Sequence, residues 1–479
     1  MPQGGSRLRP RGGTGGASHI GLPPALLRAA PLPRRAFGSM LRHPTRVIPL
    51  AFLVVILLGT GLLMLPPART DGQGAPLLTA LFTATSATSL SGLSIVDMAT
   101  YWTFPGQVVI LLLMQAGGLG ILTGATLLGL LVRRRIRLSS RLMTQAELQV
   151  IAPGDVAAIL RLVLAMTLGT ELLVAAALCL RLRLAYGMDW GEAAWTGIFH
   201  AVSAYTNAGL STYNDSLVRF GADLAVTGPV MLAVLAGGIG VPVVHDLRRA
   251  PLAPQRWSLH TRLTLIGSGA LLLLGWAGVL AYEWGNPATL AGLPVAERVH
   301  GALFHAVMTR SGGFNTVDVA AMRPETLLLS SALMLIGGGS ASTAGGIRVT
   351  TFVLLGLAVW AEVRGSPDVN AFGRRMPESL LRQALTIALL AIGVVCAATL
   401  LLLSLTDLPA EKVLFEVVSA LATVGLSAGV SADLPMPGLV VLTGLMFLGR
   451  VGTVTIATAL ALRGARATYR YPEERTIVG

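Results

Sequence analysis

The chain has 479 residues, of which 53% are hydrophobic and 12% charged, whereas soluble domains carry roughly 25% charged residues. This composition excludes an ordinary soluble protein and predicts an integral membrane protein. The formal net charge of +13 does not indicate a nucleic-acid partner, because the basic residues gather in the two tails and in alternate loops. By the positive-inside rule, both termini are expected in the cytoplasm.

The N-terminal stretch, residues 1–45, is rich in Gly, Pro and Arg, and no acidic residue precedes Asp71. We expect a disordered cytoplasmic tail. A transit peptide has a similar composition and is the alternative, and Met40 is an alternative start of the chain. At the other end, residues 466–479 are expected to form a cytoplasmic C-terminus.

Eight hydrophobic stretches lie between the tails, each long enough to cross a hydrocarbon core of ~30 Å. They form four pairs, which predicts repeats at residues 46–135, 136–250, 251–365 and 366–465. The predicted spans are Val47–Leu65, Gly106–Val132, Val156–Leu180, Ala222–Val244, Leu259–Tyr282, Thr326–Trp360, Leu380–Leu405 and Leu439–Leu462.

A short motif separates the two spans of each pair, and each copy begins as an apolar helix and ends at a glycine. The copies read LFTATSATSLSGL, IFHAVSAYTNAGL, LFHAVMTRSGGF and LFEVVSALATVGL. Two helical turns cover less than half of the hydrocarbon core, so we predict re-entrant loops on the outer side. An even number of crossings separates the copies, which predicts parallel repeats around an axis along the membrane normal.

Backbone without helical structure survives at membrane depth only where it is buried or faces water, and its carbonyls can replace the hydration shell of an ion. We therefore predict an all-α membrane protein with eight transmembrane helices and four pore loops around a central pore. The competing interpretation is four glycine-capped helices without a pore. The predicted filter residues are Ser89, Leu90, Ser91, Gly92, Thr206, Asn207, Ala208, Gly209, Arg310, Ser311, Gly312, Gly313, Ala422, Thr423, Val424 and Gly425.

The second span of each pair carries a glycine-rich signature: AGGLG, AGGIG, IGGGS and LGRVG. In the first two copies it indicates close helix packing. In the fourth copy Arg450 takes the position of Gly118, Gly238 and Gly338. A mid-membrane arginine costs at least ~2.5 kcal/mol and should face a cavity or a partner, so we predict one positive charge beside the pore, inward of the filter. A structural salt bridge is the alternative.

The third copy continues into a stretch with five glycines in ten residues, within a span longer than one crossing requires. A continuous helix there would lose roughly 1 kcal/mol per glycine relative to alanine. We predict a broken helix whose irregular middle closes the cavity under the filter as a gate, with Arg348 as its anchor. The alternative is a kink that widens the vestibule. The predicted gate residues, besides Arg450, are Gly337, Gly338, Gly339, Ser340, Ala341, Ser342, Thr343, Ala344, Gly345 and Gly346.

The other polar residues of the membrane region have less specific roles. Glu171, Glu416, His200 and His305 are candidates for an ion or proton relay, but we favour bracing of the loops for the last three. Arg310 is expected to hold loop backbone, because a guanidinium that lined a cation filter would repel the ion. Two carboxylates that follow the loops, Asp97 and Asp318, would concentrate cations at the mouth.

No enzyme motif is present in the sequence, and the two cysteines, Cys179 and Cys396, lie in apolar spans without metal-ligand spacing. No cofactor is therefore expected, and the transported ion is the only ligand that the loops require.

After the N-terminal tail, the sequence resembles the Trk/Ktr/HKT superfamily of potassium transporters, most closely the KtrB-type membrane subunit. The resemblance rests on SATSLSGLSIVD, FHAVSAYTNAGLS, RSGGFNT, FEVVSALATVGLS, the break before GGIR, MFLGRVG and YPEERTIVG. Departures are SLSGL where TVTGL is common, Arg348 where lysine is usual, and a tail before His43 without a counterpart.

The resemblance implies four membrane–pore–membrane repeats, a homodimer and a cytoplasmic ring of nucleotide-binding RCK subunits. It matches Gly92, Gly209, Gly313 and Gly425 to filter glycines that accompany K⁺ preference, Arg450 to the pore arginine and residues 337–346 to the gating loop. The implied function is K⁺ uptake at the bacterial plasma membrane, with activation by Na⁺ left open. Alternatives are a Trk-type or ion-coupled symporter and a non-conducting membrane scaffold.

Overall fold

The computed structural model describes residues 44–120 and 156–461, and every structural statement below concerns these residues. The predicted N-terminal tail up to residue 43, the basic loop at Arg133 and the predicted C-terminal segment 466–479 lie outside the described residues.

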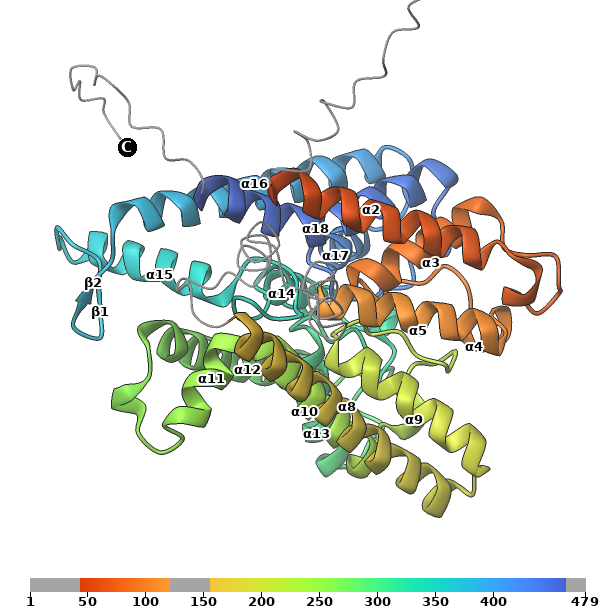
Figure 1. Cartoon of the computed structure of the whole chain (residues 1–479). Helices are drawn as coiled ribbons and strands as arrows, with labels where there is room; N and C mark the ends of the chain where they lie inside the picture. The colour runs from red at the N-terminus through yellow and green to blue at the C-terminus, as the bar shows by residue number, and fades with distance from the viewer. Residues whose placement is uncertain (1–43, 121–155, 462–479) are drawn as a thin grey trace, which may run out of the picture.

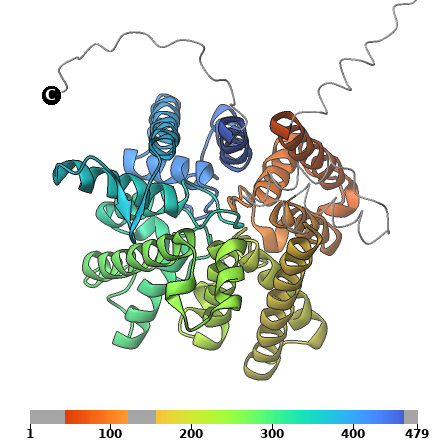
Figure 2. The same cartoon turned by 60° about the vertical axis from the view of Figure 1, so that its left-hand side comes forward.

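The described helices repeat one order four times: a long apolar helix, a short helix and a second apolar helix. Figure 2 shows the four groups, from red-orange to blue, around a common centre. The first helices are α2 (Pro44–Leu63), α8 (Val156–Tyr186), α12 (Leu259–Glu283) and α16 (Glu378–Leu403). The short helices are α3 (Leu77–Ser89), α9 (Trp190–Tyr205), α13 (Val295–Met308) and α17 (Ala410–Leu421). The closing helices are α5 (Phe104–Leu119), α10 (Leu224–Ile239), the pair α14 (Pro324–Leu335) and α15 (Val349–Val363), and α18 (Met436–Ala461).

Several of these helices have the length and apolarity of membrane spans. Among the described residues, three helices meet both requirements on their own: Leu160–Tyr186 of α8, α12 and α16. Their outward faces carry exposed leucines, for example Leu172 on α8 and Leu400 on α16, as expected for surfaces that contact lipid. The protein is a helical membrane protein with several apolar spans.

The C-terminal halves of the four short helices are buried, and Figure 1 shows α3 and α9 in separate parts of the fold. Each short helix contributes one phenylalanine at the same place in the repeated motif, and all four are completely buried: Phe82, Phe199, Phe304 and Phe415. Burial of such large side chains stabilises each helix far more than its intrinsic propensity, since helices of about 12 to 16 residues are marginal alone.

Two predicted spans are not continuous helices. The predicted span Ala222–Val244 is wrong as a single helix, because α10 and α11 (Val241–Arg249) meet at an angle of 98°. At the bend, Gly240 has a φ of +96°, and a Cβ atom there would collide with the carbonyl of Ser340. In the predicted span Thr326–Trp360, α14 ends at Leu335 and α15 begins at Val349, with irregular backbone between them.

The connection between α15 and α16 corrects the purely helical prediction. It contains a two-stranded antiparallel hairpin, in which β1 (Asn370–Ala371) pairs with β2 (Arg374–Arg375). The remaining short helices α4 (Met98–Tyr101), η1 (Pro66–Ala68), η2 (Val218–Phe220), η3 (Pro254–Arg256) and η4 (Val319–Ala321) lie in other connections.

Candidate functional site

Four glycines, each after the end of a short helix, lie next to one another although 104 to 117 residues separate them in sequence. A Cβ atom on Gly209 would lie 2.5 Å from the Cα of Gly313, and one on Gly425 would lie 3.0 Å from the Cα of Gly92. All four glycines have positive φ angles, between 69° and 95°. A side chain would therefore meet both backbone strain and the backbone of a neighbouring loop.

The residue two positions before each glycine also has a positive φ, although none of these residues is glycine: Leu90, Asn207, Ser311 and Thr423. In every copy, the N–H of the next residue donates to a carbonyl of its own short helix, at 2.8 to 2.9 Å. A trans peptide unit points its carbonyl opposite to its N–H. The carbonyls of the four positive-φ residues therefore point away from the short helices.

The C-terminal ends of all four short helices meet at these loops. Ser89 is the last residue of α3, and Thr206 and Ala422 cap α9 and α17. A helix C-terminus carries roughly −0.5 elementary charge. Four such ends beside a ring of glycine backbone create a site that favours a cation without a carboxylate.

Polar side chains on two of the short helices hold the segments that follow the glycines. His200 Nε2 lies 2.8 Å from Ser211 Oγ, and the Glu416 carboxylate accepts from Ser427 Oγ (2.9 Å), from the N–H of Ala428 and from Ser431 Oγ. These contacts confirm the predicted bracing role for both residues. His305 instead lies 3.0 Å from Ser330 Oγ on α14.

The third loop is connected to the irregular segment between α14 and α15, here called the 337–346 loop. Arg310 Nη2 donates to the carbonyl of Gly337 at 2.8 Å, the kind of backbone contact that we predicted for this arginine. The N–H of Gly345 donates to Ser311 Oγ (3.1 Å), which in turn donates to the carbonyl of Thr423 in the fourth loop (2.6 Å). A chain of hydrogen bonds thus joins the 337–346 loop to two of the glycine loops.

The bend after α10 supports the other side of the 337–346 loop. The N–H of Gly339 donates to the carbonyl of Gly238 (2.9 Å), and the N–H of Thr343 donates to the carbonyl of Gly237 (3.2 Å). After the bend, the N–H of Val241 donates to the carbonyl of Ala341 (3.2 Å). The 337–346 loop therefore occupies the position that a straight continuation of α10 would need.

Arg348, two residues after the 337–346 loop, anchors this loop, as predicted. Its Nη1 donates to the carbonyls of Ala344 (2.7 Å) and Gly339 (3.1 Å) and lies 3.3 Å from Ser342 Oγ. A single guanidinium thereby satisfies two backbone carbonyls of a segment that has no helical hydrogen bonds.

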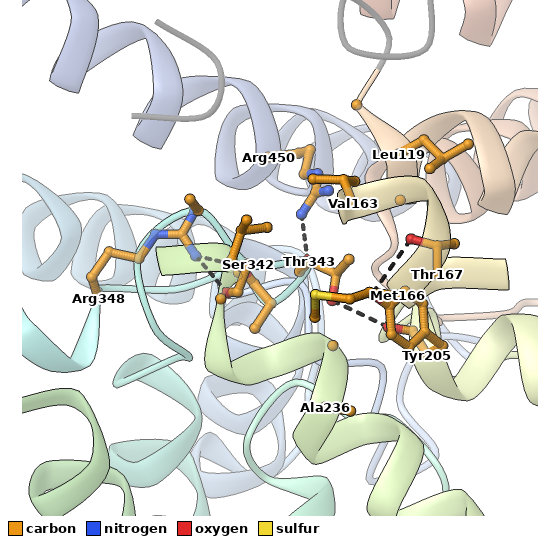
Figure 3. A pocket seen from close by; sticks show the side chains of 18 of the residues that line it. Leu119, Val163, Met166, Thr167, Tyr205, Ala236, Ser342, Thr343, Arg348 and Arg450 are labelled. Atoms are coloured by element: carbon orange, nitrogen blue, oxygen red, sulfur yellow. Dashed lines mark hydrogen bonds between the residues drawn. The ribbon is translucent and has the colours of Figure 1, made fainter. Parts of the chain in front are cut away.

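A cavity of about 100 Å³ lies beside Thr343, and Arg348 and Arg450 are among the residues that line it. Figure 3 shows Arg450 and Thr343 joined by a hydrogen bond in this cavity. Arg450 Nη1 donates to the carbonyl of Thr343 (2.5 Å), and Nη2 donates to the carbonyl of Gly117 on α5 (2.9 Å). Thr343 Oγ1 donates to Asn207 Oδ1 (2.7 Å) in the second glycine loop. Helix α18 is thus linked through one arginine to the 337–346 loop and to α5.

Three glycines seat the closing helices against the short helices: Gly117 and Gly237, where close helix packing was predicted, and Gly449, which the sequence interpretation missed. A Cβ atom on Gly117, Gly237 or Gly449 would collide with the last carbonyls of α3, α9 or α17, respectively. Each is the residue before the position compared in the sequence alignment of the repeats, so the repeated signature contained the signal. Gly337 has no such contact with a short helix, and its Cβ would instead meet the carbonyl of Gly345.

Comparisons with known proteins agree with this architecture. A family model described as TrkH, cation transport protein, matches residues 30–250 and 257–466. The Ktr system potassium uptake protein B of Bacillus subtilis is 34% identical over 438 residues, covering 91% of this chain and 97% of the relative. The potassium/sodium uptake protein NtpJ of Enterococcus hirae is 32% identical over 443 residues, with 91% and 97% covered.

A solved structure has the same fold. The crystal structure of the potassium transporter TrkH from Vibrio parahaemolyticus matches with a TM-score of 0.64 at 20% identity, covering 86% of this chain and 84% of that chain. The family match spans most of the sequence, and a family of transporters accounts for the apolar helices. The chain therefore belongs to the TrkH family of cation transport proteins and is a multi-pass membrane transporter, not an enzyme.

Proposed function

We propose that this protein conducts K⁺ through a central pore formed by four parallel membrane–pore–membrane repeats. The observation that carries the proposal is the ring of four positive-φ glycines at the converging C-termini of four short helices. In this proposal the four residues that end at each glycine form the filter, and their carbonyls replace the hydration shell of K⁺. The potassium uptake that names the Bacillus subtilis relative supports the choice of ion.

The proposed gate is the 337–346 loop together with Arg450. The loop lies beside the cavity and bonds directly to the second and third glycine loops, and the Arg450 guanidinium adds a positive charge among the lining residues. A cation that left the filter would have to displace the loop and pass this charge. Opening therefore requires that the bonds between the loop, Arg450 and the α10 bend are broken together.

The membrane potential is sufficient to drive uptake through such a pore. One elementary charge gains ~2.3 kcal/mol per 100 mV, which corresponds to roughly 50-fold accumulation. Coupling to a second ion is not required. The name of the Enterococcus hirae relative, a potassium/sodium uptake protein, favours Na⁺ as an activator or co-transported ion as the second candidate.

The assembly that we propose is a homodimer in a bacterial plasma membrane, with both termini in the cytoplasm. Control of the gate by a nucleotide would come from separate cytoplasmic subunits that form a ring. The connections between the repeats of this chain are too short to contain a nucleotide-binding domain. The description of the Bacillus subtilis relative as a component of a Ktr system supports a regulatory partner.

The test is Rb⁺ influx into K⁺-loaded liposomes that contain the purified full-length protein, at defined voltage and with external K⁺ or Na⁺ as competitor. We expect influx that K⁺ suppresses and that reverses with voltage alone. A Gly209→Ala variant should lose this flux, while Gly61→Ala, whose Cβ would meet no atom within 4 Å, should retain it. Absence of flux from the wild type and from the gate variant Arg450→Ala would refute the proposal, and a dependence on a Na⁺ gradient would favour the coupled alternative.

A further inference from the structure

A buried carboxyl group joins the first repeat to the second. Glu171 lies in the middle of α8 and is 7% exposed. Gln115 of α5 donates its Nε2 to Glu171 Oε2 at 3.1 Å. An ionisable residue at this depth in a membrane is costly and marks a functional position unless a partner neutralises its charge.

The two side chains leave one oxygen each without a hydrogen bond. Glu171 Oε1 and Gln115 Oε1 are both buried, and neither has a hydrogen-bond partner among the described residues. An ionised carboxylate and an amide oxygen are both acceptors only, so the pair cannot satisfy these atoms by itself. A proton on Glu171 Oε1 would convert it into a donor for Gln115 Oε1. One proton thus satisfies both atoms and completes a two-bond acid–amide pair.

No cationic side chain within the described residues forms an ion pair with Glu171. The neighbouring helices α5 and α10 contain no titratable residue, and α9 presents Tyr205. On α8 itself, Arg161 and Arg181 are each ten residues away, about 15 Å along the helix, and Arg181 bonds to Asp223 at 2.8 Å. Among the residues that the structure describes, an ionised Glu171 would therefore be a buried charge without a cationic partner.

Gln115 and Glu171 each lie near a contact that holds the proposed gate. Gln115 is two residues before Gly117, whose carbonyl accepts from Arg450. One turn before Glu171, Thr167 Oγ1 lies 3.4 Å from the hydroxyl of Tyr205 (Figure 3). The carbonyl of that tyrosine lies 3.2 Å from Thr343 Oγ1. A change of charge at Glu171 would thus act on elements that contact the 337–346 loop from two sides.

We propose that Glu171 and Gln115 form an intramembrane proton-binding site whose occupancy stabilises the closed gate. Binding of one proton converts the carboxylate to a neutral acid and fixes α8 against α5. Release of the proton leaves a negative charge near the cavity, which draws water, a cation or the Arg450 guanidinium toward it and weakens the contacts of the 337–346 loop. The effect on flux rests on the proposed conduction and gating.

The proton site itself is tested without transport, by infrared titration of the full-length protein in lipid. We expect the carbonyl stretch of a protonated, buried carboxylic acid, which disappears as the pH rises. Glu171→Gln should lack this band, because its amide can accept from Gln115 Nε2 and donate to Gln115 Oε1 without titrating. A titrating band that is unchanged in Glu171→Gln, or no such band in the wild type even at acidic pH, overturns the proposal.

Rb⁺ flux in the same liposomes tests the link to the gate. Wild-type flux should increase with pH by at most about tenfold per pH unit, the limit for one proton, whereas Glu171→Gln should remain low at every pH. The control Glu192→Gln changes an exposed carboxylate at the start of α9 and should keep the wild-type pH dependence. An unaltered pH response in Glu171→Gln overturns the link to the gate. If no variant conducts while the infrared band behaves as expected, the proton site stands and the proposed conduction fails.

Discussion

The contacts of Arg450 allow the most direct test of the gate. Arg450→Ala removes the side chain that joins α18 to the carbonyls of both Thr343 and Gly117, and it also removes a positive charge from the cavity lining. Both changes favour conduction, because one weakens the closed state and the other lowers the barrier for a cation. We expect higher flux in the absence of any activating partner.

The size of the effect follows from the two hydrogen bonds. A bond from a charged donor contributes about 1.5 to 3 kcal/mol, and the lower value applies here because the carbonyls that are left free can be hydrated from the cavity. Two bonds at the lower value give about 3 kcal/mol, or roughly a 100-fold shift toward the open state. The measured rise in flux will be smaller than this factor if most molecules of the variant are already open, because flux cannot rise further once the open state predominates.

Basal Rb⁺ flux into liposomes at equal protein density measures this shift. Arg450→Lys keeps the charge but not the two-pronged geometry, so its flux should lie between those of the wild type and the alanine variant. The matched control is Arg382→Ala, which removes an exposed arginine that pairs with Glu378 on α16. If Arg450→Ala assembles normally and its basal flux equals that of the wild type, the gating role of this arginine is refuted.

Three further variants test other parts of the proposed pore. Gly209→Ala should abolish flux, because positive φ costs about 1–2 kcal/mol and the new Cβ would lie 2.5 Å from the Cα of Gly313; Rb⁺ influx measures the loss, and wild-type flux would contradict it. Deletion of Gly339–Gly345 should raise the basal Rb⁺ flux. A deletion variant whose basal flux stays at the wild-type level would exclude this segment as the gate. Glu416→Ala leaves several buried donors without an acceptor, so thermal unfolding in detergent should show a loss of about 2–3 kcal/mol, and an unchanged midpoint would refute the bracing role.

Repetition in the sequence was sufficient to predict the order that recurs four times, a long apolar helix, a short helix and a closing apolar segment. Each short helix ends three to five residues before the glycine that its motif marks, since the same local constraint, a turn with positive φ angles after an apolar helix, recurs four times. The break between α14 and α15 was predictable for a similar reason, because five glycines in ten residues remove the helical preference locally.

Features that depend on distant residues were not predictable. The bend at Gly240 exists because the carbonyl of Ser340, one hundred residues later, occupies the space beside it, and the local sequence reads as an uninterrupted apolar span. The same holds for Glu171, whose partner Gln115 lies on another repeat. The hairpin after α15 was missed because its polar residues, such as Arg374, lie outside the apolar pattern that guided the prediction.

The two actions of Arg450 can be separated by combining its substitution with the loop deletion. If the arginine acts mainly by holding Thr343, Arg450→Ala should have little effect once Gly339–Gly345 is absent, because the bonded carbonyl is gone. If it acts mainly as a charge that repels cations, the substitution should raise flux equally in both backgrounds, since the charge lines the cavity in either case. We expect the roughly 100-fold effect to fall to about tenfold in the deletion background, because only the bond to Gly117 remains to be lost. Fully additive effects would assign the closed state to electrostatic repulsion and leave the hydrogen bond to Thr343 without a role in gating.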